Sequence, residues 1–387
     1  MRVLIIGGAG VVGAKTAALL AKNSAVSKVV VADRRKGKVD QVIANVRSKK
    51  VSGQVVDINN ADALISVMRE SDIAMNLVGP YYVHGTKVLT AAIKAKINYI
   101  DVCDDYDATA DMLKLDAEAR KAGITALIGM GAGPGVMNLV AKYGANKCDQ
   151  VDKIHFYWYQ HISSEGAGAG QGLHGFHLFA DKVTQFLEGK WVMVPAGSGG
   201  EMVKFADIEV ECFYVGHSEP VTMPRYIKGV REVYNKACLL PVEIMQEMLK
   251  MVELGFGSKE AMKIKGDIFV APREMALAVQ ALSVKRKDLG KARAGMRIDV
   301  HGKRGGNTVQ YTYMPGQTAD SAAGSVDIGT SLPFTIAALM LVQGEIRTKG
   351  VVAPEGCIDP KLFLSRLKIA GGLEFLETEC ITKKLEL

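Results

Sequence analysis

The chain has 387 residues, of which 48% are hydrophobic and 23% are charged, and its formal net charge is +7 at pH 7. This length exceeds that of one ordinary core and predicts two domains, while the composition is that of a globular protein. No apolar run approaches the roughly 20 residues of a membrane-spanning helix and no targeting segment precedes the first strand, so we expect a cytoplasmic protein without a membrane partner.

The chain opens with an apolar strand over residues 2–6, a glycine-rich turn and a helix over residues 14–22. Gly8 permits the tight turn, Gly10 lets backbone N–H groups approach a pyrophosphate, and Gly13 lets the helix pack closely on the sheet. The positive end of the helix dipole adds to this attraction for phosphate. The predicted dinucleotide turn therefore comprises Gly8, Ala9, Gly10, Val11, Val12 and Gly13.

A second strand over residues 28–32 ends at Asp33, where a carboxylate is placed to bind both hydroxyls of an adenosine ribose. Asp33 favours NAD, because the 2′-phosphate of NADP would face its charge, whereas Arg34 and Arg35 are placed to accommodate that phosphate. We therefore predict NAD or NADP as the cofactor, with NAD favoured. A glycine turn that has lost its ligand is the alternative.

Helix-length and strand-length segments alternate regularly up to residue 145. The predicted helices cover residues 37–48, 61–69, 85–95, 108–122 and 136–145, and the predicted strands cover 54–57, 73–78, 99–102 and 125–128. This alternation predicts βαβ units around a parallel sheet with helices on both faces. The predicted class is α/β, with an N-terminal Rossmann doubly wound parallel sheet.

Later strand candidates are longer and more aromatic, and they predict an α+β substrate domain with a mixed, largely antiparallel sheet. They cover residues 154–159 and 209–215 and a hairpin, 296–302 with 308–314, joined through Gly305-Gly306. The glycine-rich segment 163–172 is either a lid or a plain connection. An apolar helix follows at 335–343. We predict a Rossmann domain over 1–130, a substrate and dimerisation domain over 131–340, and a segment over 341–387 that returns to the first domain.

Metal and nucleic-acid sites are not expected. The six cysteines are scattered and predict reduced thiols. His174 and His177 fit one helix face, but no third ligand is placed near them, so we predict no metal. The basic residues between 285 and 297 lack interleaved aromatic residues, so we predict a solvated loop and no nucleic-acid partner.

The loops that follow the strands are the places to seek ligands, because open α/β sheets bind beyond the carboxyl ends of their strands. Asp57 follows the third strand and either contacts the adenosine or belongs to the start of the next helix. Val78 and Gly79 allow the backbone to approach the cofactor. Tyr81 and Tyr82 either reach the substrate or pack as ordinary aromatic residues.

Four carboxylates follow the fifth strand, at Asp101, Asp104, Asp105 and Asp107. Close carboxylates raise one another's pKa, which suits a proton shuttle or a clamp on a substrate ammonium. The alternative is an acidic loop in which Asp107 caps the next helix.

Two further groups are candidates for binding a substrate carboxylate. The helix that opens after Gly133, Pro134 and Gly135, together with Asn138, would offer exposed N–H groups. Arg225 would pair with a carboxylate through two hydrogen bonds, or it is an ordinary surface arginine.

Taken together, these segments resemble the saccharopine dehydrogenase family. The resemblance covers nearly the whole chain and rests on the N-terminal glycine turn and on Asn76-Leu77-Val78-Gly79-Pro80-Tyr81, Tyr99-Ile100-Asp101, Gly131-Ala132-Gly133-Pro134-Gly135-Val136-Met137-Asn138, Gly344-Glu345-Ile346, Lys349-Gly350-Val351 and Pro354-Glu355.

The resemblance implies a Rossmann domain, a mixed-sheet substrate domain, a homodimer, and NAD(P)-linked oxidation or reduction at a carbon–nitrogen bond of an amino acid or polyamine. Tyr81 matches the tyrosine in the Pro-Tyr loop of saccharopine reductases. Those enzymes carry an aspartate immediately before the Pro-Gly pair, where this chain has Gly133. This departure argues against saccharopine itself and favours the branch of lysine 6-dehydrogenases or an uncharacterised one.

The predicted chemistry is hydride exchange with a carbon that bears nitrogen, through an imine. We expect Tyr81 to manage the proton on that nitrogen and Asp104 or Asp105 to hold a substrate ammonium. The alternative is a regulatory protein of the same fold that binds the nucleotide without catalysis.

Overall fold

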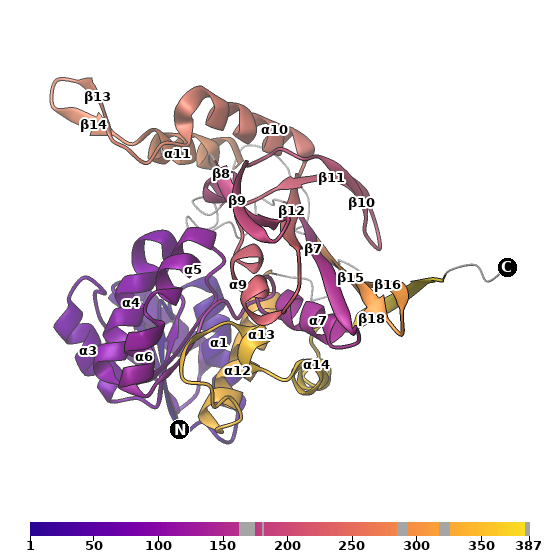
Figure 1. The fold of residues 1–387 in the computed structure, drawn as a ribbon. Coiled ribbons are helices and arrows are strands. Elements are labelled where there is room, and N and C mark those ends of the chain that lie inside the picture. Colours follow the sequence, from indigo (N-terminus) through magenta and orange to yellow (C-terminus); the bar gives the residue numbers. More distant parts are fainter. Residues whose placement is uncertain (162–174, 180–181, 285–292, 317–325, 384–387) are drawn as a thin grey trace. The chain divides into compact units, whose positions relative to one another are not determined.

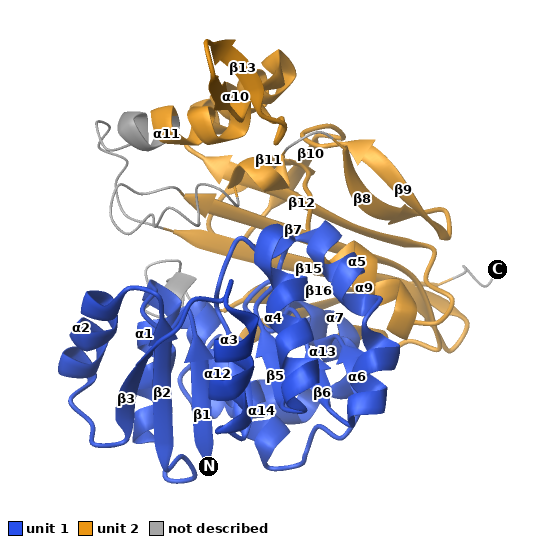
Figure 2. Ribbon diagram, turned by 90° about the vertical axis from the view of Figure 1, so that its left-hand side faces the viewer, with its two compact units in different colours: residues 1–143, 326–374 blue, residues 144–325, 375–387 orange. Residues whose placement is uncertain are grey.

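The computed structural model describes residues 1–161, 175–179, 182–284, 293–316 and 326–383 (Figure 1). The chain forms two compact units, of which unit 1 holds residues 1–143 and 326–374 and unit 2 holds residues 144–325 and 375–387 (Figure 2). The glycine-rich segment 163–172, His174 and the basic residues 285–292 lie outside the described residues.

A seven-stranded parallel sheet forms the centre of unit 1, in the order β17-β6-β5-β4-β1-β2-β3. The strand order reverses between β1 and β4, which is the switch point where doubly wound sheets bind their ligands. This arrangement confirms the predicted Rossmann fold. The strands are β1 (Arg2–Ile6), β2 (Lys28–Asp33), β3 (Val51–Val55), β4 (Ile73–Asn76), β5 (Asn98–Asp101), β6 (Thr125–Leu127) and β17 (Gly350–Val352).

Helices cover both faces of this sheet because its strands are apolar on both sides. Leu4 and Ile6 join one core cluster with side chains of the helices α3 to α6, while Val3 and Ile5 are buried on the opposite face, where α12 packs against α1. The helices are α1 (Val11–Lys22), α2 (Lys36–Val46), α3 (Ala61–Arg69), α4 (Tyr81–Ala95), α5 (Tyr106–Leu113), α6 (Asp116–Ala122), α7 (Val136–Ala145), α12 (Val326–Val342), α13 (Pro354–Cys357) and α14 (Pro360–Ile369).

Several boundaries in unit 1 differ from the sequence-based prediction; for example, α12 begins at Val326 rather than at residue 335. β3 begins at Val51 rather than residue 54, because Val51–Val55 pair in parallel register with β2. α4 begins at Tyr81 rather than residue 85: Pro80 is its N-cap and Gly85 is buried in the helix beside Met112. The single helix expected over 108–122 divides into α5 and α6.

A nine-stranded mixed sheet forms the centre of unit 2, as predicted. The order is β10-β11-β12-β7-β15-β16-β18, with β8 pairing with β12 and β9. β12 and β7 run parallel, and the other pairs are antiparallel. The strands are β7 (Gln150–His161), β8 (Lys182–Leu187), β9 (Lys190–Pro195), β10 (Glu201–Lys204), β11 (Glu209–Tyr214), β12 (Glu232–Leu240), β15 (Ala294–Arg304), β16 (Asn307–Pro315) and β18 (Phe375–Thr382).

The remaining elements of unit 2 are helices and one short hairpin. They are α9 (Glu219–Tyr226), α10 (Val242–Met251), η1 (Val252–Phe256), β13 (Met262–Lys265), β14 (Ile268–Val270) and α11 (Pro272–Val284). The predicted hairpin between β15 and β16 is confirmed, with Gly305 and Gly306 at φ values of 57° and 79°. Of the helices that the structure describes, none has the length and apolar character to cross a bilayer.

The C-terminal segment divides between the two units. Residues 326–374 belong to unit 1, where β17 extends the parallel sheet beside β6. The last strand, β18, instead pairs with β16 in unit 2. The segment 341–387 therefore does not return to the Rossmann domain as a whole, because the exposed edge of β16 takes up the final eight-residue strand.

Candidate functional site

The glycine turn between β1 and α1 has no room for side chains at its key positions. A Cβ on Gly8 would lie 2.9 Å from the carbonyl oxygen of Ile5, and one on Gly13 would lie 2.6 Å from the Cα of Gly8. Gly10 is the N-cap of α1 and offers no capping side chain. Because the N–H groups of a first helical turn lack intrahelical acceptors, this turn fits an anionic pyrophosphate.

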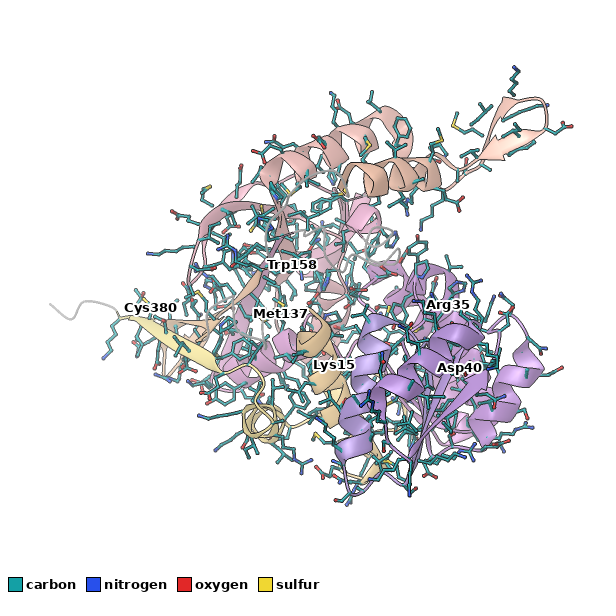
Figure 3. The ribbon with its side chains drawn as sticks, turned by 180° about the vertical axis from the view of Figure 1, so that it is seen from behind. Lys15, Arg35, Asp40, Met137, Trp158 and Cys380 are labelled. Carbon is teal, nitrogen blue, oxygen red and sulfur yellow. The ribbon has the colours of Figure 1, made fainter. Side chains whose placement is uncertain are left out.

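Asp33 lies at the end of β2. Its carboxylate is paired with Arg35, a residue that the sequence analysis placed near the 2′-phosphate of NADP. Its Oδ1 accepts hydrogen bonds from the backbone N–H and the Nε of Arg35, both at 3.0 Å, and its Oδ2 accepts one from Nη2 at 3.1 Å. Figure 3 labels Arg35 among the side chains of unit 1. Burial by itself would raise the pKa of Asp33, but these hydrogen bonds outweigh it and lower the pKa. The negative charge that favoured NAD is therefore neutralised, and Arg34 beside it is exposed.

Two loops on the same edge of the sheet hold the remaining candidate cofactor residues. Asp57 is exposed and accepts a hydrogen bond from the N–H of Asn59, while Asn60 caps α3. Val78 donates its N–H to the Asn76 side chain, and Gly79 is exposed with no atom near its Cβ position. Capping of α3 therefore belongs to Asn60, and the surface at Asp57 and Gly79 is open.

A buried polar network links the carboxyl ends of β4, β5 and β6. The Asn76 amide donates to the Tyr99 hydroxyl at 2.9 Å, and that hydroxyl donates to Asp101 at 2.8 Å. Asp101 also accepts from the N–H groups of Cys103 and Gly129. Burial raises the pKa of Asp101 to about 6. Sequence reasoning missed Asn76 and Tyr99, although polar groups inside short apolar strands were a visible signal.

The predicted catalytic group surrounds this network, and two of its members are buried. The Tyr81 hydroxyl donates to the Asn76 carbonyl at 3.0 Å, and burial followed by the charge of Asp101 raises its pKa well above the ordinary value. Asp105 accepts from the N–H of Tyr82 at 3.1 Å and so joins the first turn of α4 to the start of α5. Asp104 is half-buried and close enough to act on the pKa of Tyr81.

The loop before α7 is closed on itself rather than open to a ligand. A Cβ on Gly135, whose φ is +115°, would lie 2.3 Å from the carbonyl oxygen of Gly131, and Pro134 beside it is buried. Asn138 is also buried; its Oδ1 accepts from the Gly135 N–H at 3.0 Å and its Nδ2 donates to Glu355 of α13 at 3.0 Å. These contacts replace the expected cradle of exposed amides, because the returning C-terminal segment covers the loop.

The last two substrate-binding candidates, Gly133 and Arg225, differ in their exposure to solvent. Gly133, at the position of the family's aspartate, is half-buried. Arg225 lies in the last turn of α9 in unit 2 and is exposed, with its guanidinium 5.4 Å above the ring of Trp191. Its Nε donates to the Val221 carbonyl at 3.2 Å.

Unit 2 contains a buried polar cluster that sequence reasoning missed. His217 and Glu219 form a hydrogen bond at the start of α9, and Asn235 of β12 joins them. Asn235 is fully buried in a strand that is otherwise largely apolar. Asn235 was the available signal, but nothing in the linear order connects it with residues 217 and 219.

Comparisons with known proteins agree with this architecture. The family model described as saccharopine dehydrogenase NADP binding domain matches residues 3–127, and the model described as saccharopine dehydrogenase C-terminal domain matches residues 182–373. The chain is 23% identical to carboxynorspermidine synthase of Vibrio alginolyticus, with 96% of this chain and 95% of the relative covered. It is 22% identical to carboxyaminopropylagmatine dehydrogenase of Synechocystis sp., with 96% of each covered.

A solved structure shares the fold over the full length. The apo saccharopine dehydrogenase (L-Glu forming) of Saccharomyces cerevisiae has a TM-score of 0.72 at 16% identity, and the match covers 98% of this chain and 99% of that one.

Proposed function

The chain belongs to the saccharopine dehydrogenase family and is an NAD(P)-dependent oxidoreductase that acts on a carbon–nitrogen bond of an amine, and from this premise we propose that its substrate is a carboxylated polyamine. The substrate class is supported by two relatives that align with the chain almost from end to end and whose names denote polyamines bearing a carboxyl group. Gly133, in place of the aspartate of saccharopine reductases, is consistent with a substrate other than saccharopine.

The observation that carries the cofactor part of the proposal is the glycine turn itself. Side chains are excluded at Gly8 and Gly13 by backbone atoms, and this exclusion brings the first turn of α1 against β1 with its N–H groups unoccupied by a cap. Residues 8–13 would hold the diphosphate, and Asp33, Arg34 and Asp57 would surround the adenosine ribose. Val78 and Gly79 would line the path toward the nicotinamide, which supplies or accepts the hydride.

The candidate substrate residues have separate roles in this proposal. Tyr81 and Asp105 shape the loop at the ends of β4 and β5, because both are buried and hydrogen-bonded to the backbone. Asp104 and Tyr82 are half-buried and are our candidates for contact with a substrate ammonium. Arg225, exposed on α9, is our candidate for the substrate carboxylate.

The test is an oxidation assay on the full chain. Carboxynorspermidine, carboxyaminopropylagmatine, saccharopine and lysine are each mixed with NAD⁺ or NADP⁺, and formation of the reduced nicotinamide is followed by absorbance. We expect turnover with at least one carboxylated polyamine. Turnover of lysine alone would replace this substrate class with that of lysine 6-dehydrogenases. Binding of cofactor without turnover of any compound would support the regulatory alternative.

We further propose that the chain forms a homodimer through unit 2. The β13–β14 hairpin projects beside α11 (Figure 1), and both of its faces carry large apolar side chains that are about 60% exposed, namely Met262, Ile264, Ile268 and Phe269. A two-stranded hairpin is marginal without a covering surface, and a second copy of the chain would supply one. Light scattering should give the mass of a dimer for the wild type and that of a monomer for Ile264→Lys; a monomeric wild type would contradict the proposal.

We propose a cytoplasmic location for the protein. All six cysteines are free thiols, and they include the exposed Cys380, which is the expected state in a reducing compartment. Fractionation of cells that express the chain, followed by detection in the soluble cytoplasmic fraction, tests this location.

A further inference from the structure

The buried polar network at the carboxyl ends of β4, β5 and β6 has no role in the function proposed above. Its three side chains, Asn76, Tyr99 and Asp101, are fully buried. Asn76 and Asp101 are direct partners in the parallel register of β4 and β5. A carboxylate without water is costly unless hydrogen bonds replace its hydration, so the burial of Asp101 needs an explanation.

One oxygen of Asp101 joins the loops that follow β5 and β6. Its Oδ1 accepts hydrogen bonds from the backbone N–H groups of Cys103, at 3.0 Å, and Gly129, at 2.8 Å. Gly129 has a φ of +70°, and a Cβ there would lie 3.1 Å from the carbonyl oxygen of Cys103. The two loops therefore meet where a glycine is required, and the carboxylate holds them together.

The other oxygen of Asp101 reaches the loop after β4 through two side chains. The Tyr99 hydroxyl donates to Asp101 Oδ2 at 2.8 Å and accepts from Asn76 Nδ2 at 2.9 Å. Because a carboxylate only accepts, the hydroxyl hydrogen is directed at Asp101 and the hydroxyl oxygen receives the amide hydrogen. This polarity turns Asn76 Oδ1 toward the backbone N–H of Val78, which donates to it at 3.0 Å.

The network needs an ionised carboxylate, and its surroundings allow one. Burial raises the pKa of Asp101 to about 6, while the hydrogen bonds from Gly129, Cys103 and Tyr99 act in the opposite direction. Asp101 is therefore ionised at neutral pH, and each of its oxygens accepts at least one hydrogen bond. Three loops are thus fixed by one buried anion.

Val78 is the point at which this network meets the proposed cofactor site. The loop after β4 packs against the start of the glycine turn, since a Cβ on Gly7 would lie 2.8 Å from the carbonyl carbon of Leu77 and 3.0 Å from Cγ2 of Val78. The backbone N–H of Leu77 also donates to the Ile6 carbonyl at 2.8 Å. A cofactor whose diphosphate binds the glycine turn would extend across this loop, at the switch point between β1 and β4.

We propose that Asp101, Tyr99 and Asn76 are positioning residues for the nicotinamide. Their hydrogen bonds fix the backbone of the loop at Val78 and Gly79, and this backbone orients the ring for hydride transfer. The positioning role rests on the cofactor site proposed above, and it requires no contact between the three side chains and the cofactor. Since the rate of hydride transfer depends steeply on orientation, loss of the network should lower kcat but spare the binding of the adenosine half.

The test uses Tyr99→Phe in the full chain, because this change removes a single oxygen atom at the centre of the network. The Kd for ADP-ribose, which lacks the nicotinamide, is measured by titration calorimetry and should stay within about 2-fold of wild type. The fluorescence anisotropy of bound NADH should fall, because a nicotinamide that is not held rotates faster than the protein. In the oxidation of a carboxylated polyamine, kcat should fall by about 10-fold to 100-fold.

A second variant and a matched control accompany this measurement. Asn76→Leu breaks only the connection to Val78 and keeps the hydrogen bonds of Asp101, so it should give the same pattern even if Tyr99→Phe fails to fold. The control is Thr125→Val, at the amino end of β6. It also removes a buried hydroxyl, one that donates to the Thr348 carbonyl at 2.8 Å, and it should keep all three wild-type values.

The outcomes separate this inference from the proposed function. Either folded variant with wild-type NADH anisotropy and a kcat within about 3-fold of wild type would overturn the inference alone. An equal weakening of ADP-ribose and NADH binding would do the same, and so would the unfolding of both variants, seen by circular dichroism, beside a folded Thr125→Val. A wild type that binds neither ligand would overturn both proposals. A wild type that binds both but oxidises none of the four test compounds would overturn only the proposed substrate, because anisotropy and calorimetry still decide this inference.

Discussion

The salt bridge at the end of β2 makes a specific prediction about cofactor choice. We consider Arg35→Met, which removes the guanidinium but keeps an unbranched side chain of similar length. In the wild type, Arg35 occupies both oxygens of Asp33. The matched control is Lys36→Met, which removes the same charge from the next residue, where the exposed Lys36 pairs with the exposed Asp40.

The magnitude follows from the charges involved. For a 2′-phosphate about 6 Å from the Asp33 carboxylate, and an effective dielectric constant of about 40 at this partly exposed site, repulsion costs about 1.4 kcal/mol for each unit of charge. Loss of the Arg35 attraction adds a term of the same order. We therefore expect the Kd for NADP to rise by about 10-fold to 100-fold, and the Kd for NAD, which lacks this phosphate, to change by less than about 3-fold.

Titration calorimetry with both cofactors at low salt measures these constants directly. The difference between the variants should shrink at high salt, because exposed charges are screened over about 10 Å at 0.1 M. Equal weakening of NAD and NADP binding by Arg35→Met would refute the reasoning, and so would an equal effect of Lys36→Met, because either result would mean that the pairing with Asp33 is immaterial.

Gly10→Ala should abolish detectable cofactor binding in the same calorimetry without unfolding the protein. The new Cβ would contact only the Gly7 carbonyl oxygen, at 3.3 Å, but it would occupy the space through which the phosphates approach. Gly37→Ala is the control and should bind the cofactor normally, because the space around Gly37 is open. Tyr81→Phe should cost about 1 kcal/mol in urea unfolding and leave kcat within about 3-fold, since the hydroxyl donates to the backbone carbonyl of Asn76. A 100-fold loss of kcat would instead support a catalytic role for Tyr81. The hydrogen bond from His155 lowers the pKa of Glu232 to about 2. The ionised Glu232 therefore stabilises the fold above pH 4.5, and this stabilisation is lost as the pH falls toward 2. Glu232→Gln should reduce the change in unfolding free energy across this pH range by about 1–2 kcal/mol.

The sequence predicted correctly those structural features that depend on residues close together in the chain. The glycine turn and the alternation of short apolar strands with helices predict the Rossmann sheet, because each depends on residues close in sequence. The hairpin at Gly305 and Gly306 was predictable for the same reason, since two successive residues with positive φ define that turn.

The sequence did not reveal which polar side chains would form hydrogen bonds or ion pairs with one another. It did not show that the Arg35 side chain would pair with Asp33, two residues before it. Nor did it show that the Asn138 amide would donate to Glu355, more than 200 residues away along the chain. Both outcomes depend on which groups burial leaves in need of a partner, and that need exists only after the sheet and its covering helices have formed.

The amino-acid sequence by itself determined the fold class, the family and the position of the dinucleotide turn, since these rest on periodicity and on glycines at short, fixed spacing. Only the tertiary structure decided that the Tyr81 hydroxyl is buried against the Asn76 carbonyl and that His217, Glu219 and Asn235 form one cluster. Strands brought together across a mixed sheet create such a cluster, and the hydrogen bonds that define it join residues whose separation along the chain carries no signal.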